Sequence, residues 1–151
     1  MAARILVVDD EPSIVKLVKT TLAARGYTID EAFDGQEAIV QAKLHHPDLI
    51  LLDVMMPRMD GNEVRKRLLS DPATKDILIV HLTAVGDYDK QREAMADGVA
   101  DYIVKPFTPS DLADHVADIL DPKKREQVKK ERGQKSAQLR KITDIMHRSK
   151  D

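Results

Sequence analysis

The sequence has 151 residues, of which 42% are hydrophobic and 3% aromatic, so it can form one domain with an aliphatic core. It contains no cysteine, which excludes a disulfide framework and a thiolate metal site. Residues 1–122 carry 13 Lys/Arg and 22 Asp/Glu, whereas residues 123–151 carry 11 and 4, so a body of net charge −9 precedes a tail of net charge +7.

The apolar runs of the sequence are short. The first, within residues 1–8, is shorter than the apolar segment of a secretory signal and leads directly into three acidic residues. No run approaches the length that crosses a bilayer. We therefore expect a cytoplasmic protein without a membrane span.

Strand and helix patterns alternate along the first 120 residues. Apolar, β-rich runs predict strands over residues 5–8, 27–31, 49–53, 77–82 and 100–104. Apolar residues at helical spacing predict a helix after each strand. The first begins at Pro12 and stops at Gly26, the second ends before Pro47, the third ends near Asp71, the fourth covers residues 87–96, and the fifth is capped by Thr108 or Ser110. Asp34-Gly35 is interpreted as a turn after the second strand.

This rhythm predicts an α/β fold. Continuous apolar runs such as residues 49–52 are typical of strands buried on both faces, which is the usual state in a parallel sheet. Five strand–helix units with right-handed crossovers give a doubly wound, five-stranded parallel sheet, for which 2-1-3-4-5 is one of two common strand orders. We expect this body over residues 1–121 and a basic, helical extension or linker over residues 122–151.

Three carboxylates are expected at one edge of this sheet. Asp9 and Asp10 follow the first strand and Asp53 ends the third, and these strands are neighbours in the order 2-1-3-4-5. Carboxylates so close repel one another, and a hard divalent ion such as Mg²⁺ relieves the repulsion. A loop carbonyl after Asp53 can add a ligand. A carboxylate beside Mg²⁺ can accept a phosphoryl group.

Two further strand ends supply groups for the phosphoryl oxygens. Lys105 ends the fifth strand and offers a positive charge, and Thr83 ends the fourth and offers a hydroxyl beside a backbone amide near Ala84. Each signal alone is more often structural: an acidic pair is often a helix cap, a threonine a strand-end hydroxyl, and Lys105-Pro106 a solvated turn. Their joint occurrence at four strand ends favours a phosphoryl site.

Histidine is absent from the acidic cluster, which argues against zinc. His81 lies within the apolar run of the fourth strand. We interpret it as a core or edge histidine whose hydrogen bonds are satisfied, rather than as a ligand.

Four stretches of the sequence resemble the receiver domains of two-component response regulators, a family with a flavodoxin-like (βα)5 fold; they are residues 5–11, 48–61, 83–84 and 101–107. The resemblance covers residues 4–121. It implies that Asp53 accepts a phosphoryl group from a sensor histidine kinase or a histidine phosphotransfer protein in a Mg²⁺-dependent reaction. It also implies that Asp9, Asp10, Asp53 and the backbone carbonyl of Met55 bind the Mg²⁺.

The resemblance implies a switch as well. Thr83 and Lys105 contact the phosphoryl group, and Thr83 draws toward it while Tyr102 turns inward. The helix 4–strand 5–helix 5 face then changes and controls a protein partner. Pro106 resembles a proline that follows a cis peptide bond in the family. The protein is not expected to be an enzyme on outside substrates, since it only accepts a phosphoryl group and loses it to water.

Two positions flank this chemistry, and both are apolar: Met55, two residues after Asp53, and Val85, two residues after Thr83. Neither side chain orients an attacking water well, so we expect slow loss of the phosphoryl group. Met55 also argues against an aspartyl-phosphate phosphatase, which typically has a second Asp there. The other alternative is a regulator that binds nucleic acid through the basic tail, although a solvated helix is favoured for residues 123–151.

Overall fold

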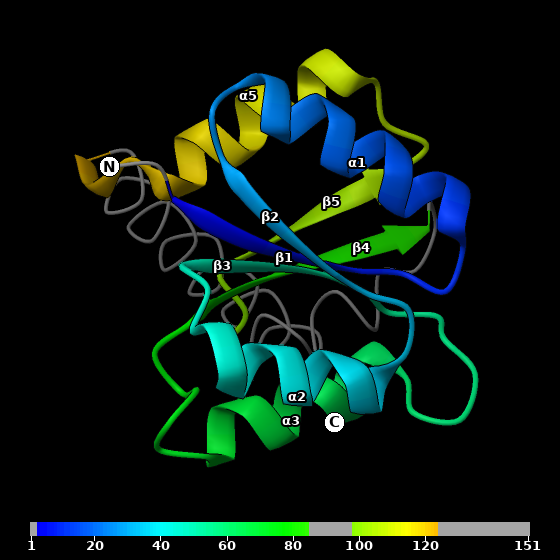
Figure 1. Ribbon diagram of the computed structural model, residues 1–151, viewed down its shortest axis with the longest axis vertical. Helices are drawn as coiled ribbons and strands as arrows, with labels where there is room; N and C mark the ends of the chain where they lie inside the picture. Colours follow the sequence, from blue (N-terminus) through cyan, green and yellow to red (C-terminus); the bar gives the residue numbers. More distant parts are fainter. Residues whose placement is uncertain (1–2, 85–97, 124–151) are drawn as a thin grey trace, which may run out of the picture. The chain divides into compact units, whose positions relative to one another are not determined.

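The computed structural model describes residues 3–84 and 98–123. Five parallel strands form one sheet in the order β2-β1-β3-β4-β5 (Figure 1), which confirms the predicted α/β architecture and strand order. The strands are β1 (Arg4–Val8), β2 (Thr28–Ala32), β3 (Leu49–Asp53), β4 (Leu78–Ala84) and β5 (Asp101–Lys105). The helix expected over residues 87–96 and the extension from residue 124 onward lie outside the described residues.

The helices cover both faces of the sheet. They are α1 (Pro12–Ala24), α2 (Gly35–His45), α3 (Gly61–Ser70) and α5 (Pro109–Leu120). Residues up to Val116 form one compact unit and the later residues belong to a second. Within the first unit, α1 and the first two turns of α5 lie on one face, and α2 and α3 lie on the other (Figure 1). Within residues 3–84 and 98–123, no helix is long and apolar enough to cross a membrane.

Strand β3 is the centre of the core, because all five of its residues are buried. Its even-numbered apolar residues join one hydrophobic cluster with α2 and α3. The main members of that cluster are Leu6, Val8, Ala38, Ala42, Ile50, Leu52, Val64, Leu68 and Ile79. Since complete burial of a leucine side chain contributes about 2 kcal/mol, this packing holds the carboxyl end of β3, and with it Asp53, firmly in place.

The two helices on this face begin in the same way. Asp34 is the N-cap of α2, and its carboxylate accepts a hydrogen bond from the backbone N–H of Glu37 at 2.8 Å. In α3, Asp60 accepts from the N–H of Glu63 at 2.9 Å. The interpretation of Asp34-Gly35 as the turn after the second strand is therefore wrong for Gly35, which is the first residue of a helix. The repeated Asp-Gly-x-Glu pattern is a signal for a helix start that a turn interpretation overlooks.

The loop between β3 and α3 contains a strained residue. Arg58 has a φ of 69°, in the left-handed region. The N–H of Met59 donates to the carbonyl oxygen of Pro57 at 2.8 Å, so these three residues form a γ-turn around Arg58. Any residue with a Cβ is strained in this conformation, whereas glycine is not.

Replacing Arg58 with glycine should therefore stabilise the protein. We expect Arg58→Gly to raise the free energy of unfolding by about 1 kcal/mol, measured by urea denaturation, because the left-handed strain is removed. Lys16→Gly is the matched control, since Lys16 is exposed within α1 and the same change there should lower stability by about 1 kcal/mol. A loss of stability in both variants would contradict the strain at Arg58.

Candidate functional site

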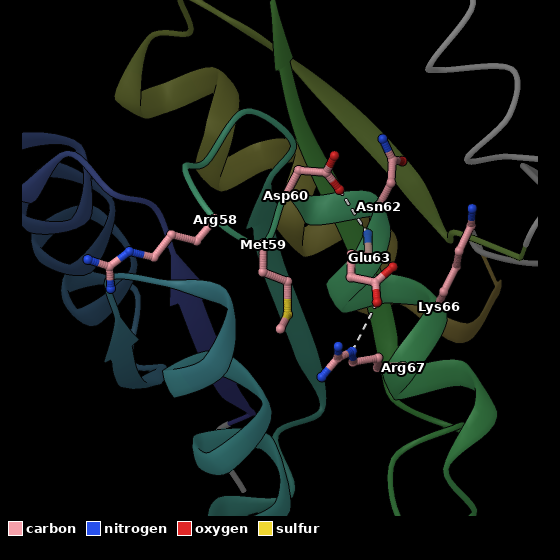
Figure 2. Close-up of a pocket in the computed structure, with 7 residues that line it drawn as sticks. All are labelled: Arg58, Met59, Asp60, Asn62, Glu63, Lys66 and Arg67. Atoms are coloured by element: carbon pink, nitrogen blue, oxygen red, sulfur yellow. Dashed lines mark hydrogen bonds and ion pairs between the residues drawn. The ribbon is translucent and has the colours of Figure 1, made fainter.

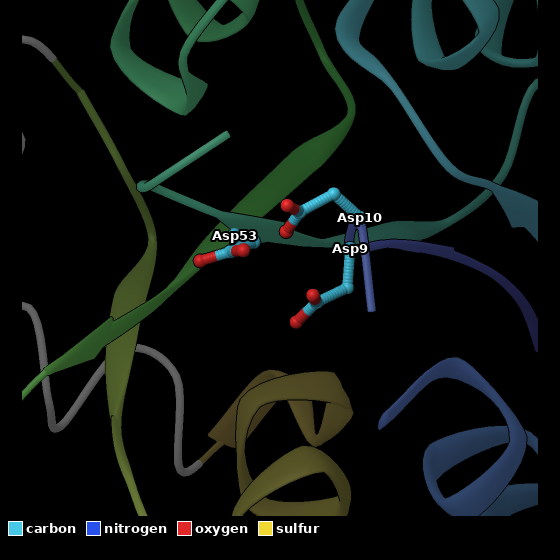
Figure 3. A group of neighbouring side chains, drawn as sticks. All are labelled: Asp9, Asp10 and Asp53. Atoms are coloured by element: carbon cyan, nitrogen blue, oxygen red, sulfur yellow. The ribbon is translucent and has the colours of Figure 1, made fainter. Parts of the chain in front are cut away.

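The three predicted carboxylates meet at the carboxyl edge of the sheet. Asp9 and Asp10 follow β1, and Asp53 is the last residue of β3, the neighbouring strand. One carboxylate oxygen from each residue lies within 4.8 Å of those of the other two, and Figure 3 shows the side chains converging. Asp9 and Asp53 are buried, whereas Asp10 is exposed. The cluster therefore has a buried floor and one ligand at the solvent side.

Lys105 reaches this cluster from the end of β5. Its Nζ donates to Oδ2 of Asp9 at 2.7 Å and lies 3.5 Å from Oδ1 of Asp53. Burial opposes protonation, but the hydrogen bond with Asp9 and the negative charge of Asp53 outweigh it, so the pKa of Lys105 is raised. The site therefore contains a permanent cation directly beside the two buried carboxylates.

One lysine does not balance three carboxylates. Burial, followed by the negative charge of Asp9, raises the pKa of Asp53 from 3.8 to about 7. The charge of Lys105 and the backbone N–H of Met55, which donates to Oδ1 of Asp53 at 3.2 Å, act in the opposite direction but do not restore the ordinary pKa. The site therefore has a strong electrostatic reason to bind a cation.

The donor set fits a hard divalent ion. Within the described residues, the cluster offers three carboxylates and neither imidazole nor thiolate. Mg²⁺ takes oxygen ligands and keeps several waters, so one exposed and two buried carboxylates suit it better than zinc. Met55 follows Asp53 closely in the loop, which is where a backbone carbonyl ligand would be needed.

The backbone beside Asp53 is held on two sides. The N–H of Val54 donates to the carbonyl oxygen of Leu82 at 3.1 Å, and the N–H of Gly61 donates to the carbonyl oxygen of Val54 at 3.0 Å. A Cβ on Gly61 would overlap the carbonyl oxygen of Asp53 and lie 2.8 Å from Cα of Val54. Gly61 thus allows the start of α3 to lie directly against the end of β3. No pattern in the sequence predicted this role of Gly61.

Thr83 lies at the same edge of the sheet. It is 2% exposed and follows Leu82, the residue of β4 that is in register with Asp53. Lys105 follows Val104, which is in register with Thr83. The peptide bond between Lys105 and Pro106 is cis. The four strand ends named from the sequence thus converge on one region.

Tyr102 and Met55 lie at the margins of this region. Tyr102 is half-buried on β5, three residues before Lys105, so it lies deeper along the sheet than the carboxylates. Met55 is 60% exposed, and its backbone N–H donates to Oδ1 of Asp53 at 3.2 Å. An exposed apolar residue therefore contacts Asp53 through its backbone. Val85, the second flanking position, lies outside the described residues.

His81 differs from its prediction. It is buried, with 1% of its surface exposed, but its Nε2 has no hydrogen-bond partner within the described part of the chain. The interpretation of a satisfied histidine is therefore wrong for this nitrogen. Burial, followed by the positive charge of Arg65, lowers the pKa of His81 to about 4, so the imidazole is neutral at pH 7. Arg65 itself is fully buried on α3, and its Nη1 donates to Oδ1 of Asn62 at 2.7 Å.

A polar groove lies over the start of α3, away from the three carboxylates. Figure 2 shows Arg58 and Lys66 pointing in different directions, and two of the other charges are already paired, Arg67 with Glu63 at 3.1 Å. The groove therefore does not focus charge on one point, and the carboxylate cluster remains the candidate site. The groove is lined by Arg58, Met59, Asp60, Asn62, Glu63, Lys66 and Arg67.

Comparisons with known proteins agree with this geometry. A family model described as the response regulator receiver domain matches residues 5–117. The chain is 43% identical over 117 residues to the "Probable transcriptional regulator ycf27" of Cyanophora paradoxa. The matched region covers 78% of this chain and 48% of the relative. It is 42% identical over 107 residues to the response regulator PleD of Caulobacter vibrioides, covering 71% of this chain and 24% of PleD.

A solved structure gives the same result. The chain is similar to the chemotaxis response regulator CheY4 of Vibrio cholerae, with a TM-score of 0.75 and 36% identity over 80% of this chain and 100% of CheY4. The chain spans about half the length, or less, of the two curated relatives named above.

Removing the charge of Asp53 should stabilise the protein in the absence of divalent ions. The folded chain has a pKa of about 7 at Asp53 against 3.8 ordinarily, so protonation contributes stability that is complete below pH 3.8 and lost as the pH rises through 7. The side chain of Asp53→Asn cannot ionise. The free energy of unfolding of this variant should therefore exceed that of the wild type at pH 8 by about 2 kcal/mol. The difference should vanish near pH 4. Urea denaturation with EDTA across this range measures it.

Asp76→Asn is the control, because Asp76 is exposed and lies outside the cluster. The difference in free energy of unfolding between Asp76→Asn and the wild type should be the same at pH 4 and at pH 8. If Asp53→Asn were no more stable than the wild type at pH 8, the electrostatic description of the cluster would be wrong.

Proposed function

The chain belongs to the family of response regulator receiver domains, and from this membership we propose that Asp53 accepts a phosphoryl group from the phosphohistidine of a histidine kinase or a histidine phosphotransfer protein. The observation that carries the proposal is the convergence of Asp9, Asp10, Asp53 and Lys105 at one edge of the sheet. An isolated carboxylate would be repelled by a phosphoryl group, whereas this cluster includes one cation and the ligands for another.

In the proposed transfer, a carboxylate oxygen of Asp53 attacks phosphorus as the bond from phosphorus to the donor imidazole nitrogen breaks. An acyl phosphate forms on Asp53, and the electron pair of the broken bond stays on the imidazole. Asp9, Asp10, Asp53 and the backbone carbonyl of Met55 would hold Mg²⁺, which would supply positive charge for the phosphoryl oxygens.

Two side chains of the protein hold the remaining phosphoryl oxygens. Lys105 already lies 3.5 Å from Oδ1 of Asp53, which suits an ion pair with an oxygen of the group attached there. The hydroxyl of Thr83, together with a backbone amide near Ala84, donates to another oxygen. Positioning of this kind accounts for most of the catalysis in phosphoryl transfer.

Phosphorylation then acts as a switch. Thr83 moves toward the phosphoryl oxygens and Tyr102 turns inward, and the surface around β5 and α5, to which the helix predicted over residues 87–96 would contribute, changes for a protein partner. We assign this receiver function to residues 1–121 and treat residues 122–151 as a basic extension. The relative from C. paradoxa is named as a transcriptional regulator. Nucleic-acid binding through the extension remains the alternative output, and it concerns residues that lie almost wholly outside the described ranges.

The proposal predicts modification at one residue. Wild-type protein incubated with acetyl phosphate and Mg²⁺ should gain one phosphoryl group by intact mass spectrometry, and Asp53→Ala should gain none. Omission of Mg²⁺ should abolish the gain because the phosphoryl charge is then unbalanced. Asp48→Ala serves as the control, since Asp48 lies in another part of the same unit and should leave the modification intact. Equal modification of Asp53→Ala and wild type would refute the assignment.

A second prediction concerns the lifetime of the phosphorylated form. Met55 is exposed beside Asp53 and cannot orient an attacking water with its thioether. Met55→Asn adds an amide that can, so the phosphorylated protein should lose its phosphoryl group several-fold faster, about 1 kcal/mol in barrier height. Decay is followed by mass spectrometry after removal of acetyl phosphate. Met55→Leu should lose its phosphoryl group at the wild-type rate. An unchanged lifetime in Met55→Asn would contradict the proposed effect of Met55.

A further inference from the structure

His81 presents a buried nitrogen that the proposed phosphoryl chemistry does not use. Its side chain is 1% exposed, and Nε2 has no hydrogen-bond partner within the described residues. Leaving a buried polar atom unpaired costs about 1–3 kcal/mol, so such atoms are rare in folded proteins. The unpaired nitrogen therefore requires a reason for its place in the core.

The register of the sheet makes Tyr102 the neighbour of His81 on the adjacent strand. Leu52 of β3 is in register with His81 of β4, which is in register with Tyr102 of β5. Leu52 belongs to the cluster that packs under α2 and α3, so His81 and Tyr102 project from this same face of the sheet. Asp101 lies on the opposite face, where its carboxylate binds His115 of α5 at 2.9 Å, as strand alternation requires.

Neighbouring strands lie about 4.8 Å apart, so the two aromatic rings are lateral neighbours. The hydrogen bond that the structure gives Tyr102 is made by its backbone N–H, to Oδ1 of Asp101 at 2.8 Å. Within residues 3–84 and 98–123, the Tyr102 hydroxyl is unpaired. Two complementary polar groups, a phenolic donor and an imidazole nitrogen, thus lie on adjacent strands without partners in the described part of the chain.

The electrostatic surroundings keep this imidazole an acceptor. Burial and the nearby positive charge of Arg65 hold the pKa of His81 at about 4, well below neutral pH. A neutral imidazole has one nitrogen that accepts a hydrogen bond, and a phenol can donate to it. A protonated imidazole would have no acceptor to offer.

Resting on the switch proposed above, we propose that the Tyr102 hydroxyl donates a hydrogen bond to Nε2 of His81 when Tyr102 turns inward. His81 is then a positioning residue: it touches neither the phosphoryl group nor the metal ligands, and it favours the activated arrangement by giving the incoming hydroxyl a partner. The same step gives the buried nitrogen of His81 a hydrogen-bond partner. Activation is therefore favoured because the new bond ends the cost of leaving this nitrogen unpaired.

The direct test is the imidazole ¹⁵N spectrum of the full chain, recorded before and after addition of beryllofluoride and Mg²⁺. In the wild type, the Nε2 signal of His81 should move to a hydrogen-bonded position on activation. In Tyr102→Phe, which keeps the ring and lacks the hydroxyl, the signal should not move. A shift of the same size in Tyr102→Phe would assign the bond to another donor and overturn the proposal.

Binding of beryllofluoride gives the energetic test. His81→Leu and Tyr102→Phe should each raise the half-saturating beryllofluoride concentration about fivefold, the effect of losing one hydrogen bond. The double variant should be no weaker than either single variant, because both remove the same bond. His81→Gln retains a side-chain acceptor, so its half-saturating beryllofluoride concentration should be close to that of the wild type. Additive losses would overturn the proposal.

Stability in the absence of beryllofluoride separates this role from a structural one. His81→Leu removes an unpaired buried nitrogen, so its free energy of unfolding should equal or exceed that of the wild type while its activation is weakened. A variant that lost stability and activation together would show a packing role instead, and the proposal would fail.

The two proposals fail in different ways. The ¹⁹F signal of beryllofluoride bound at Asp53 reports the proposed phosphoacceptor directly. If that signal is absent from the wild type, the proposed function is wrong. If it is present and Nε2 of His81 does not move, only the contact with Tyr102 is wrong.

Discussion

The repulsion among three carboxylates at the end of a buried strand is the constraint on which this structure depends. Asp9 and Asp53 lie in a poorly hydrated floor where their charges are costly, and Lys105 compensates for only part of that cost. The raised pKa of Asp53 expresses the remaining imbalance. A folded chain that keeps such a cluster keeps a place where added positive charge is strongly favoured, and this property makes the edge of the sheet chemically active.

The topology creates this constraint from residues far apart in the chain. The order β2-β1-β3-β4-β5 makes β1 and β3 neighbours, so Asp9 meets Asp53 although 43 residues separate them in the sequence. The register from β3 to β5 brings Thr83 and Lys105 to the same edge. All strands are parallel, so their carboxyl ends share one side of the sheet. Apolar packing around β3 then supplies the stability that the cluster removes.

Much of this could be predicted because the signals were local. Continuous apolar runs identified the strands, and the polar residue after each run indicated the edge where the site would form. The start of α2 was misjudged because Asp34-Gly35 has turn chemistry as well as the capping pattern that the fold uses. The unpaired nitrogen of His81 and the complete burial of Arg65 arise from tertiary packing, which no spacing in the sequence reveals. The roles assigned to the site residues remain predictions.

Gly61 has a mechanical consequence. Because no Cβ intervenes, the first residue of α3 rests on the carbonyl of Asp53 and is tied to Val54 by a hydrogen bond. Helix α3 and the tip of β3 are thus in direct contact, which leaves little room for Asp53 to shift relative to the helix. If Asp53 is phosphorylated as proposed, α3 is then the fixed frame, and the response is expected in the side chains of β4 and β5 instead.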